Sequence, residues 1–193
     1  MLTYNEIKEK VENGSITIQP FDLTQLNANS YDLRLTNLIS YYKDGIVIDP
    51  KENQSRDLIT TYLPEPGQKG FVLEPSIGFY LVSTVEVTYT PDTIPIIWAK
   101  SSIARLGLSL TLNGGFGDLG YKGRWTLGLQ VTRQTYIYSG MAVAQIAFFK
   151  PDGDISKLYG DISGNYQEED LSNIPTQPIA QKLYENPIFN TIK

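Results

Sequence analysis

The chain has 193 residues, with a hydrophobic content of 41%, a charged content of 19% and a formal net charge of −5. This length and composition predict one globular domain with a buried core and exclude a disordered chain. The sequence contains no cysteine and no histidine. Zinc sites and Ser-His-Asp or Cys-His catalysis are therefore excluded, which leaves carboxylate, lysine, arginine, tyrosine and serine chemistry.

The charge and hydropathy of the chain also limit its partners. A net charge of −5 provides no general basic surface, so we expect no nucleic-acid partner. No apolar run is long enough to span a membrane, and the polar residues 1–14 lack the apolar core of a signal peptide. We therefore expect a cytoplasmic protein with no membrane partner.

The N-terminal segment begins with a short predicted helix over residues 4–12. Thr3 and Glu6 have the spacing of a capping box, and Gly14 is a suitable stop. Residues 15–20 alternate between apolar and polar, which predicts a strand. We interpret the helix as a packing element without chemistry.

A second alternating segment, residues 30–35, places two opposite charges on one face of a strand. Asp32 and Arg34 share that face, and the other face is apolar. Such a pair contributes little in water, and on a buried strand it is costly unless satisfied. The pair therefore indicates a structural or site role.

The rest of the first 150 residues consists of short strand-like segments separated by turn residues. This pattern predicts an antiparallel sandwich, barrel or jelly roll. The predicted strands are 38–42, 46–48, 70–73, 79–83, 85–89, 94–99, 108–112, 124–131, 135–138 and 142–150.

The final segment, residues 151–193, is polar and has little periodicity. A disordered tail and an ordered arm both fit this composition, and its scattered aromatic residues favour an extended C-terminal arm. We therefore expect a single domain over 1–193, with a β core and N-terminal helix over 1–150 and the arm over 151–193.

The first candidate site lies directly after the predicted strand 94–99. Hydroxyl groups, backbone N–H groups and nearby cations would form a cradle for phosphate. An ordinary helix start with solvated charges is the alternative interpretation. The residues of this candidate cradle are Lys100, Ser101, Ser102 and Arg105.

The second candidate site is a glycine-rich turn over residues 113–123 that contains one carboxylate, Asp118. Glycines allow a close approach of the backbone to a ligand, and Asp118 would act as a general base that orients water. Tyr121 would stack on a sugar or base. A long hairpin loop with an Asp in a turn is the alternative.

Several motifs, in order along the chain, resemble the dCTP deaminase/dUTPase superfamily, and its deaminase branch most closely. The resemblance covers nearly the whole chain. The matching segments are IQPF (18–21), NSYDLRL (29–35), KSSIARLGL (100–108), GFGDLGYKG (115–123), MAVAQI (141–146), Tyr159 and NYQ (165–167).

This resemblance implies a distorted jelly-roll or β-barrel of the dUTPase-like type. It implies a homotrimer that binds a pyrimidine deoxynucleoside triphosphate at sites shared between subunits. It also implies Asp118 as the catalytic residue and a phosphate-binding role for the KSS…R motif. The implied nucleoside-binding residues are Asn113, Gly115, Tyr121, Gln145 and Tyr166.

The chain departs from the family pattern at one catalytic position. Family deaminases read T-L-E in the strand after the Asp motif, and that Glu is their general base, whereas this chain has Gly128. Glycine cannot relay a proton. Further departures are Gly117 in place of the usual Ile and Lys100 in place of the first Arg, which removes a bidentate fork.

Three functional hypotheses follow from the resemblance. The first is hydrolysis of dUTP to dUMP and pyrophosphate, with Asp118 orienting water and Mg²⁺ bound mainly through the substrate triphosphate, without a protein metal site of its own. The second is deamination of dCTP by a base displaced from the position of Gly128. The third is a non-catalytic nucleotide-binding trimer.

Overall fold

The computed structural model describes residues 1–49, 57–111, 115–162 and 166–167. Strands dominate it, with short helices near the chain ends and in the middle. The elements are α1 (Tyr4–Glu12), β1 (Thr17–Gln19), the 3-10 helix η1 (Leu23–Gln25), β2 (Tyr31–Tyr42), β3 (Leu58–Tyr62), β4 (Phe71–Leu73), β5 (Phe79–Tyr89), β6 (Ile94–Ala99), α2 (Ser101–Arg105), β7 (Leu108–Thr111), β8 (Lys122–Val131), β9 (Thr135–Ile137), β10 (Ala142–Phe149) and α3 (Tyr159–Ile162).

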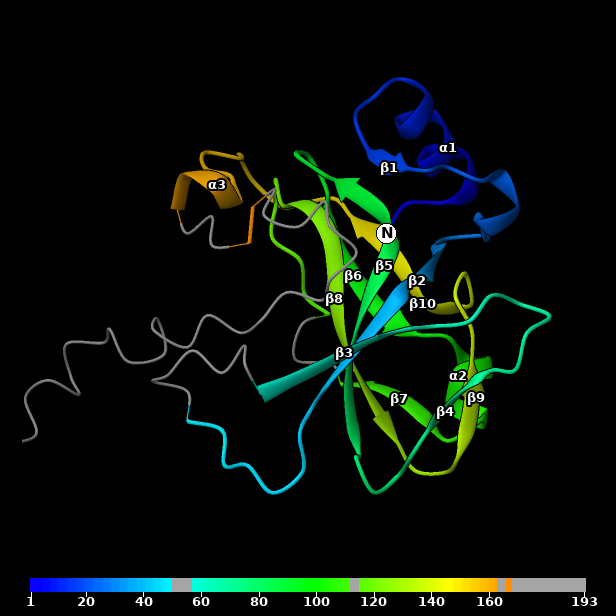
Figure 1. Ribbon diagram of the computed structural model, residues 1–193. Helices are drawn as coiled ribbons and strands as arrows, with labels where there is room; N and C mark the ends of the chain where they lie inside the picture. The colour runs from blue at the N-terminus through cyan, green and yellow to red at the C-terminus, as the bar shows by residue number, and fades with distance from the viewer. Residues whose placement is uncertain (50–56, 112–114, 163–165, 168–193) are drawn as a thin grey trace, which may run out of the picture.

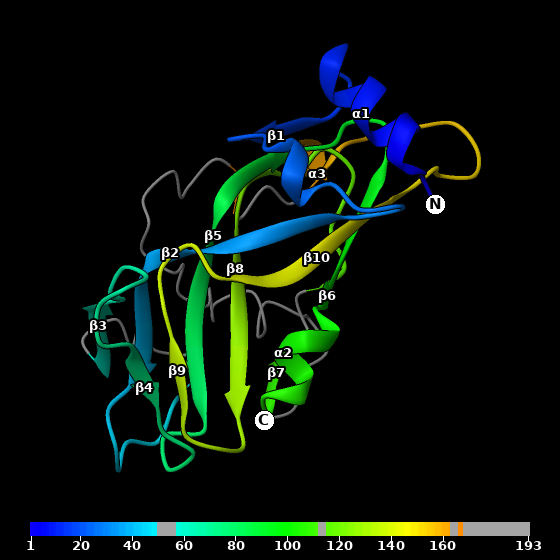
Figure 2. The same ribbon diagram turned by 90° about the vertical axis from the view of Figure 1, so that its right-hand side faces the viewer.

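The strands form a nearly closed antiparallel barrel (Figures 1 and 2). In the described part of the chain, the larger sheet has the order β6-β10-β2-β5-β8-β7, with β1 added beside β5 and β3 beside β2. Strands β4 and β9 pair separately. The predicted all-β class with a short N-terminal helix is confirmed.

The alternation in the sequence becomes the inner and outer faces of this barrel. Strand β8 buries every second residue from Gly123 to Val131. The buried side chains come from most strands of the sheet and include the large rings of Tyr31, Tyr80 and Phe148. Burial of these apolar side chains supplies the main driving force for folding.

Two pairs of predicted strands are single long strands in the structure. Residues 79–83 and 85–89 join as β5, and residues 38–42 join the alternating segment before them as β2. Both strands are irregular: the register of β5 against β8 shifts between Ser83 and Val87. A β-bulge interrupts the period of two without ending the strand, so a break in alternation is a false sign of a turn here.

The prediction of a strand over residues 46–48 is wrong, and strand β3 is absent from the predictions. Residues 46–48 have no regular structure, and Val47 is 89% exposed. Strand β3 pairs with β2, and its Thr60 hydroxyl lies 2.7 Å from that of Ser40. Its sequence, LITTY, alternates poorly because most of its side chains are exposed.

The elements that carry the candidate site lie at two ends of the barrel. Helices α1 and α3 and strand β1 lie at one end, and α2, β4 and β9 lie at the other (Figures 1 and 2).

Of the predicted arm, residues 163–165 and 168–193 lie outside the described residues. The division of the chain into core and arm therefore stays a prediction. None of the described helices is long and apolar enough to cross a membrane.

The predicted start of α1 is confirmed. One oxygen of Glu6, Oε2, accepts hydrogen bonds from the Thr3 backbone N–H at 3.0 Å and the Thr3 hydroxyl at 3.1 Å. The other, Oε1, pairs with Lys150 Nζ at 3.0 Å. These contacts, the Thr3 backbone bond first, lower the pKa of Glu6 to about 2.

This lowered pKa predicts a pH-dependent difference between the wild type and Glu6→Gln. Because the pKa of Glu6 in the fold lies below its ordinary value of 4.5, ionised Glu6 stabilises the fold above about pH 4.5 and loses this effect as the pH falls toward 2. Urea unfolding across this range should show the variant less stable at pH 6 and the difference shrinking in acid. Glu9→Gln, the same substitution on the same helix, is the matched control.

Candidate active site

The side chain of Asp118 is exposed on a turn beside β6. An isolated bridge joins Phe116 to Ile96, and the Gly117 N–H donates to the Pro95 carbonyl at 2.9 Å. The Gly120 N–H donates to the Thr90 carbonyl at 2.9 Å. The turn therefore lies along the N-terminal part of β6, and no hydrogen bond to the Asp118 carboxylate is found within the described residues.

Residues near the C-terminus hold the backbone of this turn. The Tyr159 N–H donates to the Leu119 carbonyl at 2.7 Å. The Gln167 amide accepts from the Lys122 N–H at 3.1 Å and donates to the Gly120 carbonyl at 3.0 Å. These contacts fix the backbone after Asp118 while leaving its carboxylate at the surface.

Tyr121 packs inside its own chain. Its ring centroid lies 4.6 Å from that of Trp125 and 5.7 Å from that of Tyr159, and its hydroxyl donates to the Arg124 carbonyl at 2.5 Å. Tyr166 lies close by, where its N–H donates to the Tyr159 hydroxyl at 3.2 Å. A nucleoside-binding role for Tyr121 and Tyr166 stays a prediction.

Gly117 is required by the packing of Trp125. A Cβ atom at position 117 would lie 2.5 Å from the Trp125 ring and 2.9 Å from the Pro95 carbonyl oxygen. Trp125 is held in place by a hydrogen bond from its indole N–H to Thr88 Oγ1 at 2.8 Å. The indole therefore fills the space that a side chain at position 117 would need.

Gly117→Ala is accordingly expected to lower the free energy of unfolding by about 1–3 kcal/mol, because the ring and backbone must shift. Chemical denaturation measures this difference. Gly160→Ala is the matched control, since its Cβ would meet nothing closer than 3.9 Å. A Gly117→Ala protein as stable as this control would contradict the packing described.

The predicted phosphate cradle lies at the other end of β6. Ser101, Ser102 and Arg105 belong to α2, and all three are exposed. From Pro95, beside the Asp118 turn, to Lys100 is roughly 17 Å, at about 3.3 Å per strand residue. One copy of the chain therefore does not bring Asp118 and α2 to the same place.

Lys100 and Gln145 come together on one carboxylate, Asp32. Lys100 Nζ pairs with Asp32 Oδ2, and Gln145 Nε2 donates to Asp32 Oδ1 at 3.1 Å. Asn27 Nδ2 donates to the same Oδ1 at 2.8 Å. Lys100, predicted to bind phosphate, and Gln145, predicted to bind the nucleoside, thus contact the same carboxylate. The motifs assign no binding role to that residue, Asp32.

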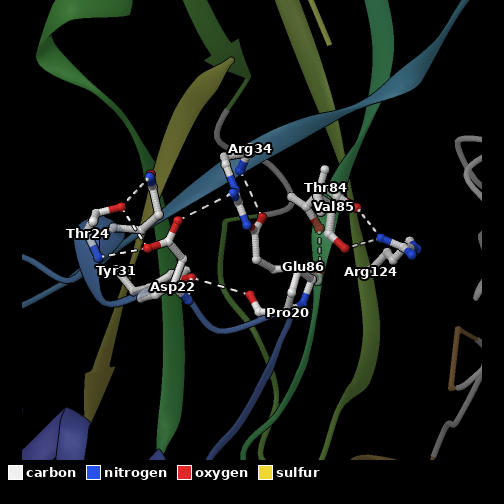
Figure 3. A network of polar contacts seen from close by, with 10 residues as sticks. Pro20, Asp22, Thr24, Tyr31, Arg34, Thr84, Val85, Glu86 and Arg124 are labelled. Carbon is white, nitrogen blue, oxygen red and sulfur yellow. Dashed lines mark hydrogen bonds and ion pairs between the residues drawn. The ribbon is translucent and has the colours of Figure 1, made fainter. Parts of the chain in front are cut away.

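Arg34 binds a separate partner, the fully buried Glu86 on β5 (Figure 3). Glu86 Oε1 accepts from Arg34 Nε at 2.6 Å, and Oε2 accepts from the Arg34 backbone N–H at 2.8 Å. Burial acts to lower the pKa of Arg34, but the hydrogen bond and charge of Glu86 outweigh it and the pKa is raised. Arg34 is therefore a structural cation that ties β2 to β5.

Glu86 is missing from the sequence-based candidates, although its sequence carries a signal. It lies between Val85 and Val87 in an apolar segment, where a charge must find a partner. The period of two along this part of β5 places Thr84 and Glu86 both inside. Arg124 Nη1 donates to the carbonyls of Thr84, at 2.9 Å, and Val85.

The remaining predicted residues lie in or next to the glycine-rich turn. Asn113 lies outside the described residues. Gly115 is buried, and its carbonyl accepts from the Ile97 N–H at 2.7 Å. Gly128, the position of the expected family Glu, pairs with Leu81 of β5 and Thr111 of β7.

The barrel and the order of its motifs define a member of the dCTP deaminase/dUTPase superfamily. Residues 1–151 match the family model described as dCTP deaminase-like. The chain therefore belongs to the dCTP deaminase-like family.

Curated relatives extend this similarity over most of the chain. The chain is 39% identical over 167 residues to the dCTP deaminase, dUMP-forming, of Leptospira biflexa, covering 86% of this chain and 90% of the relative. It is 36% identical over 178 residues to the enzyme of the same name from Hathewaya histolytica, covering 92% and 95%.

A solved structure supports the fold. The barrel matches the crystal structure of 2′-deoxycytidine 5′-triphosphate deaminase from Agrobacterium tumefaciens with a TM-score of 0.59 and 23% identity. The match covers 76% of this chain but 47% of that one, so this chain spans about half of its length.

Proposed function

We propose that this chain is an enzyme that forms dUMP from a pyrimidine deoxynucleoside triphosphate, with dCTP as the starting nucleotide. Membership of the dCTP deaminase-like family supports the substrate class. The name that the two relatives share, "dCTP deaminase, dUMP-forming", favours dCTP over dUTP alone. Of the three sequence-based hypotheses, the comparisons thus favour the deaminase alternative over dUTP hydrolysis.

Conversion of dCTP to dUMP consumes two water molecules and forms ammonia and pyrophosphate. One water supplies the oxygen that replaces the exocyclic amine, which leaves as ammonia. The other attacks the α-phosphorus and breaks the bond to the bridging oxygen, which leaves with pyrophosphate. Asp118 would accept a proton from this second water, and its exposed carboxylate is the observation that carries the proposal.

We expect Mg²⁺ to be bound mainly by the phosphate oxygens of the nucleotide, which are ligands it prefers. No group of three or more acidic side chains that would form a metal site is found in the described part of the chain. When bound, the ion would neutralise the charge that develops on the phosphates. Arg105 and the hydroxyls of Ser101 and Ser102 would position the same phosphates.

A site that uses both Asp118 and α2 requires two copies of the chain. Asp118 lies beside the Pro95 end of β6 and α2 follows its other end, and the strand rise separates Pro95 from Lys100 by roughly 17 Å. We propose that Asp118 of one copy faces α2 of a neighbouring copy, in the homotrimer that the family resemblance implies.

Hydrolysis of dUTP without deamination is the second candidate, and Gly128 is the observation that favours it. A glycine on β8 offers no group to move a proton during replacement of the amine. Asp118, which the phosphate step would use, is retained. The two candidates therefore differ in whether dCTP is a substrate and ammonia is released, and they share the phosphate step.

Separate assays of ammonia, pyrophosphate and dUMP distinguish these candidates. Incubation with dCTP and Mg²⁺ is expected to release ammonia and pyrophosphate in equal amounts. Pyrophosphate from dUTP, with no ammonia from dCTP at high enzyme concentration, would support the second candidate. Tight binding of both nucleotides without any product would overturn both in favour of a non-catalytic binding protein.

Gly128→Glu tests the importance of the missing side chain. If deamination in this chain is limited by the lack of a base at this position, the variant is expected to raise ammonia release from dCTP about 100-fold, the usual contribution of general base catalysis. Gly128→Gln is the matched control, because it adds the same volume without a base. Equal rates for both variants would show that the base lies elsewhere.

A further inference from the structure

Asp32 lies at the centre of a cross-strand row on one face of the sheet. It is 8% exposed and lies opposite Gln145, which in turn lies opposite Trp98. Lys100 comes two residues after Trp98, so its side chain points to the same face. Residues from β2, β10 and the junction of β6 with α2 therefore meet here.

The contacts of Asp32 use both of its oxygens. Oδ2 binds Lys100 Nζ, and Oδ1 accepts from Asn27 at 2.8 Å and from Gln145 at 3.1 Å. Hydrogen bonds to an ionised carboxylate are stronger than those between neutral groups. The carboxylate thus joins side chains from three separate elements at one point.

Lys100 is the member of this cluster whose position has a consequence for the site. Its side chain is 20% exposed, and the residue immediately precedes α2. A lysine side chain normally loses considerable rotamer freedom when it is fixed. Asp32 already holds the ammonium group, so Lys100 loses little further rotamer freedom when a phosphate binds.

We infer that Asp32 is a positioning residue: Asn27 and Gln145 fix its Oδ1, and its Oδ2 holds Lys100 for the triphosphate. This inference rests on the proposed function. The Asp32–Lys100 pair is electrically neutral, so Lys100 contributes an oriented donor. Arg105, which has no ion pair with any residue that the structure describes, supplies the positive charge of the cradle. Asp32 would act on substrate binding through Lys100 and without contact of its own with the nucleotide.

A double-mutant cycle tests this link. Asp32→Asn is expected to raise KM about tenfold, the effect of losing one charge-assisted hydrogen bond, with a smaller change in kcat. In a Lys100→Gln background the same substitution should change KM little, because the group it positions is gone. Asp22→Asn, an exposed substitution of the same kind, should leave KM unchanged.

Asn27→Ala keeps the test decisive if Asp32→Asn does not fold. Asn27 lies in the segment before β2 and donates a hydrogen bond to Asp32. The Asn27→Ala substitution is expected to raise KM about threefold, because the Asp32 carboxylate is then held less firmly. This rise should disappear in the Lys100→Gln background. Additive effects of Asp32 and Lys100, or an unchanged KM in both Asp32→Asn and Asn27→Ala, would overturn the inference.

Failure of the proposed function is a separate outcome. If the wild type forms no product from dCTP or dUTP, the same cycle is measured by calorimetric binding of dUTP with Mg²⁺. Coupled losses of affinity would then support the positioning role, and independent losses or no loss would overturn it.

Discussion

Asp118→Asn is expected to lower the rate of dUMP formation at least about 100-fold, because the amide cannot accept a proton from the attacking water. The fold should be unaffected, since the side chain is exposed and no hydrogen bond to its carboxylate is found among the described residues. Pyrophosphate release and thermal unfolding of the same preparation measure the two effects. Asp154→Asn, another exposed acid, should match the wild type in both.

An active Asp118→Asn protein would remove the catalytic role from this turn. A variant that loses activity together with stability would indicate instead that Asp118 supports the turn. The hydrogen bonds that hold the turn come from Tyr159 and Gln167 to its backbone. We therefore expect Asp118→Asn to lose activity without losing stability.

Glu86→Gln is expected to lower the free energy of unfolding by about 3 kcal/mol, because it leaves the charge of Arg34 without its buried partner. Glu86 is fully buried and binds both the backbone and the guanidinium of Arg34. Urea unfolding measures the loss.

The control for this substitution is Asp22→Asn on the other side of the same guanidinium. Asp22 lies 3.8 Å from Arg34 Nη1 with a side-chain exposure of 39%, so its loss should lower the stability much less than the loss of Glu86. Equal costs for the two variants would contradict the view that burial makes Glu86 the essential partner.

Much of the barrel could be predicted from the sequence because its strands obey simple alternation. Strand β8 buries every second residue, and the capping box of α1 is found where Thr3 and Glu6 place it. The long strand β5 is predicted as two strands because a bulge breaks the alternation. The edge strand β3 is absent from the predictions because its apolar residues Ile59 and Tyr62 are exposed, so its sequence shows no clear alternation.

The motifs located the candidate site but not its partners. Asp32 and Arg34 lie two residues apart and suggested one ion pair. In the structure, Asp32 binds Lys100, 68 residues away, and Arg34 binds Glu86, 52 residues away. Such contacts depend on strand order, which periodicity along one strand does not encode.

The position of Asp118 relative to α2 is the feature on which the functional account depends. The family resemblance implies sites that are shared between subunits, and the position of this turn is consistent with that expectation. The hydrogen bonds of the turn place Asp118 beside Pro95, at the end of β6 remote from Arg105. Catalysis by both groups then requires a second copy.

Mixing two inactive variants tests this arrangement most directly. Asp118→Asn and Arg105→Gln proteins are unfolded together in equal amounts, refolded and assayed for dUMP. If each site combines Asp118 of one copy with Arg105 of the next, random assembly restores about a quarter of the wild-type activity, because one pairing in four is intact. A mixture as inactive as either variant alone would contradict the shared site.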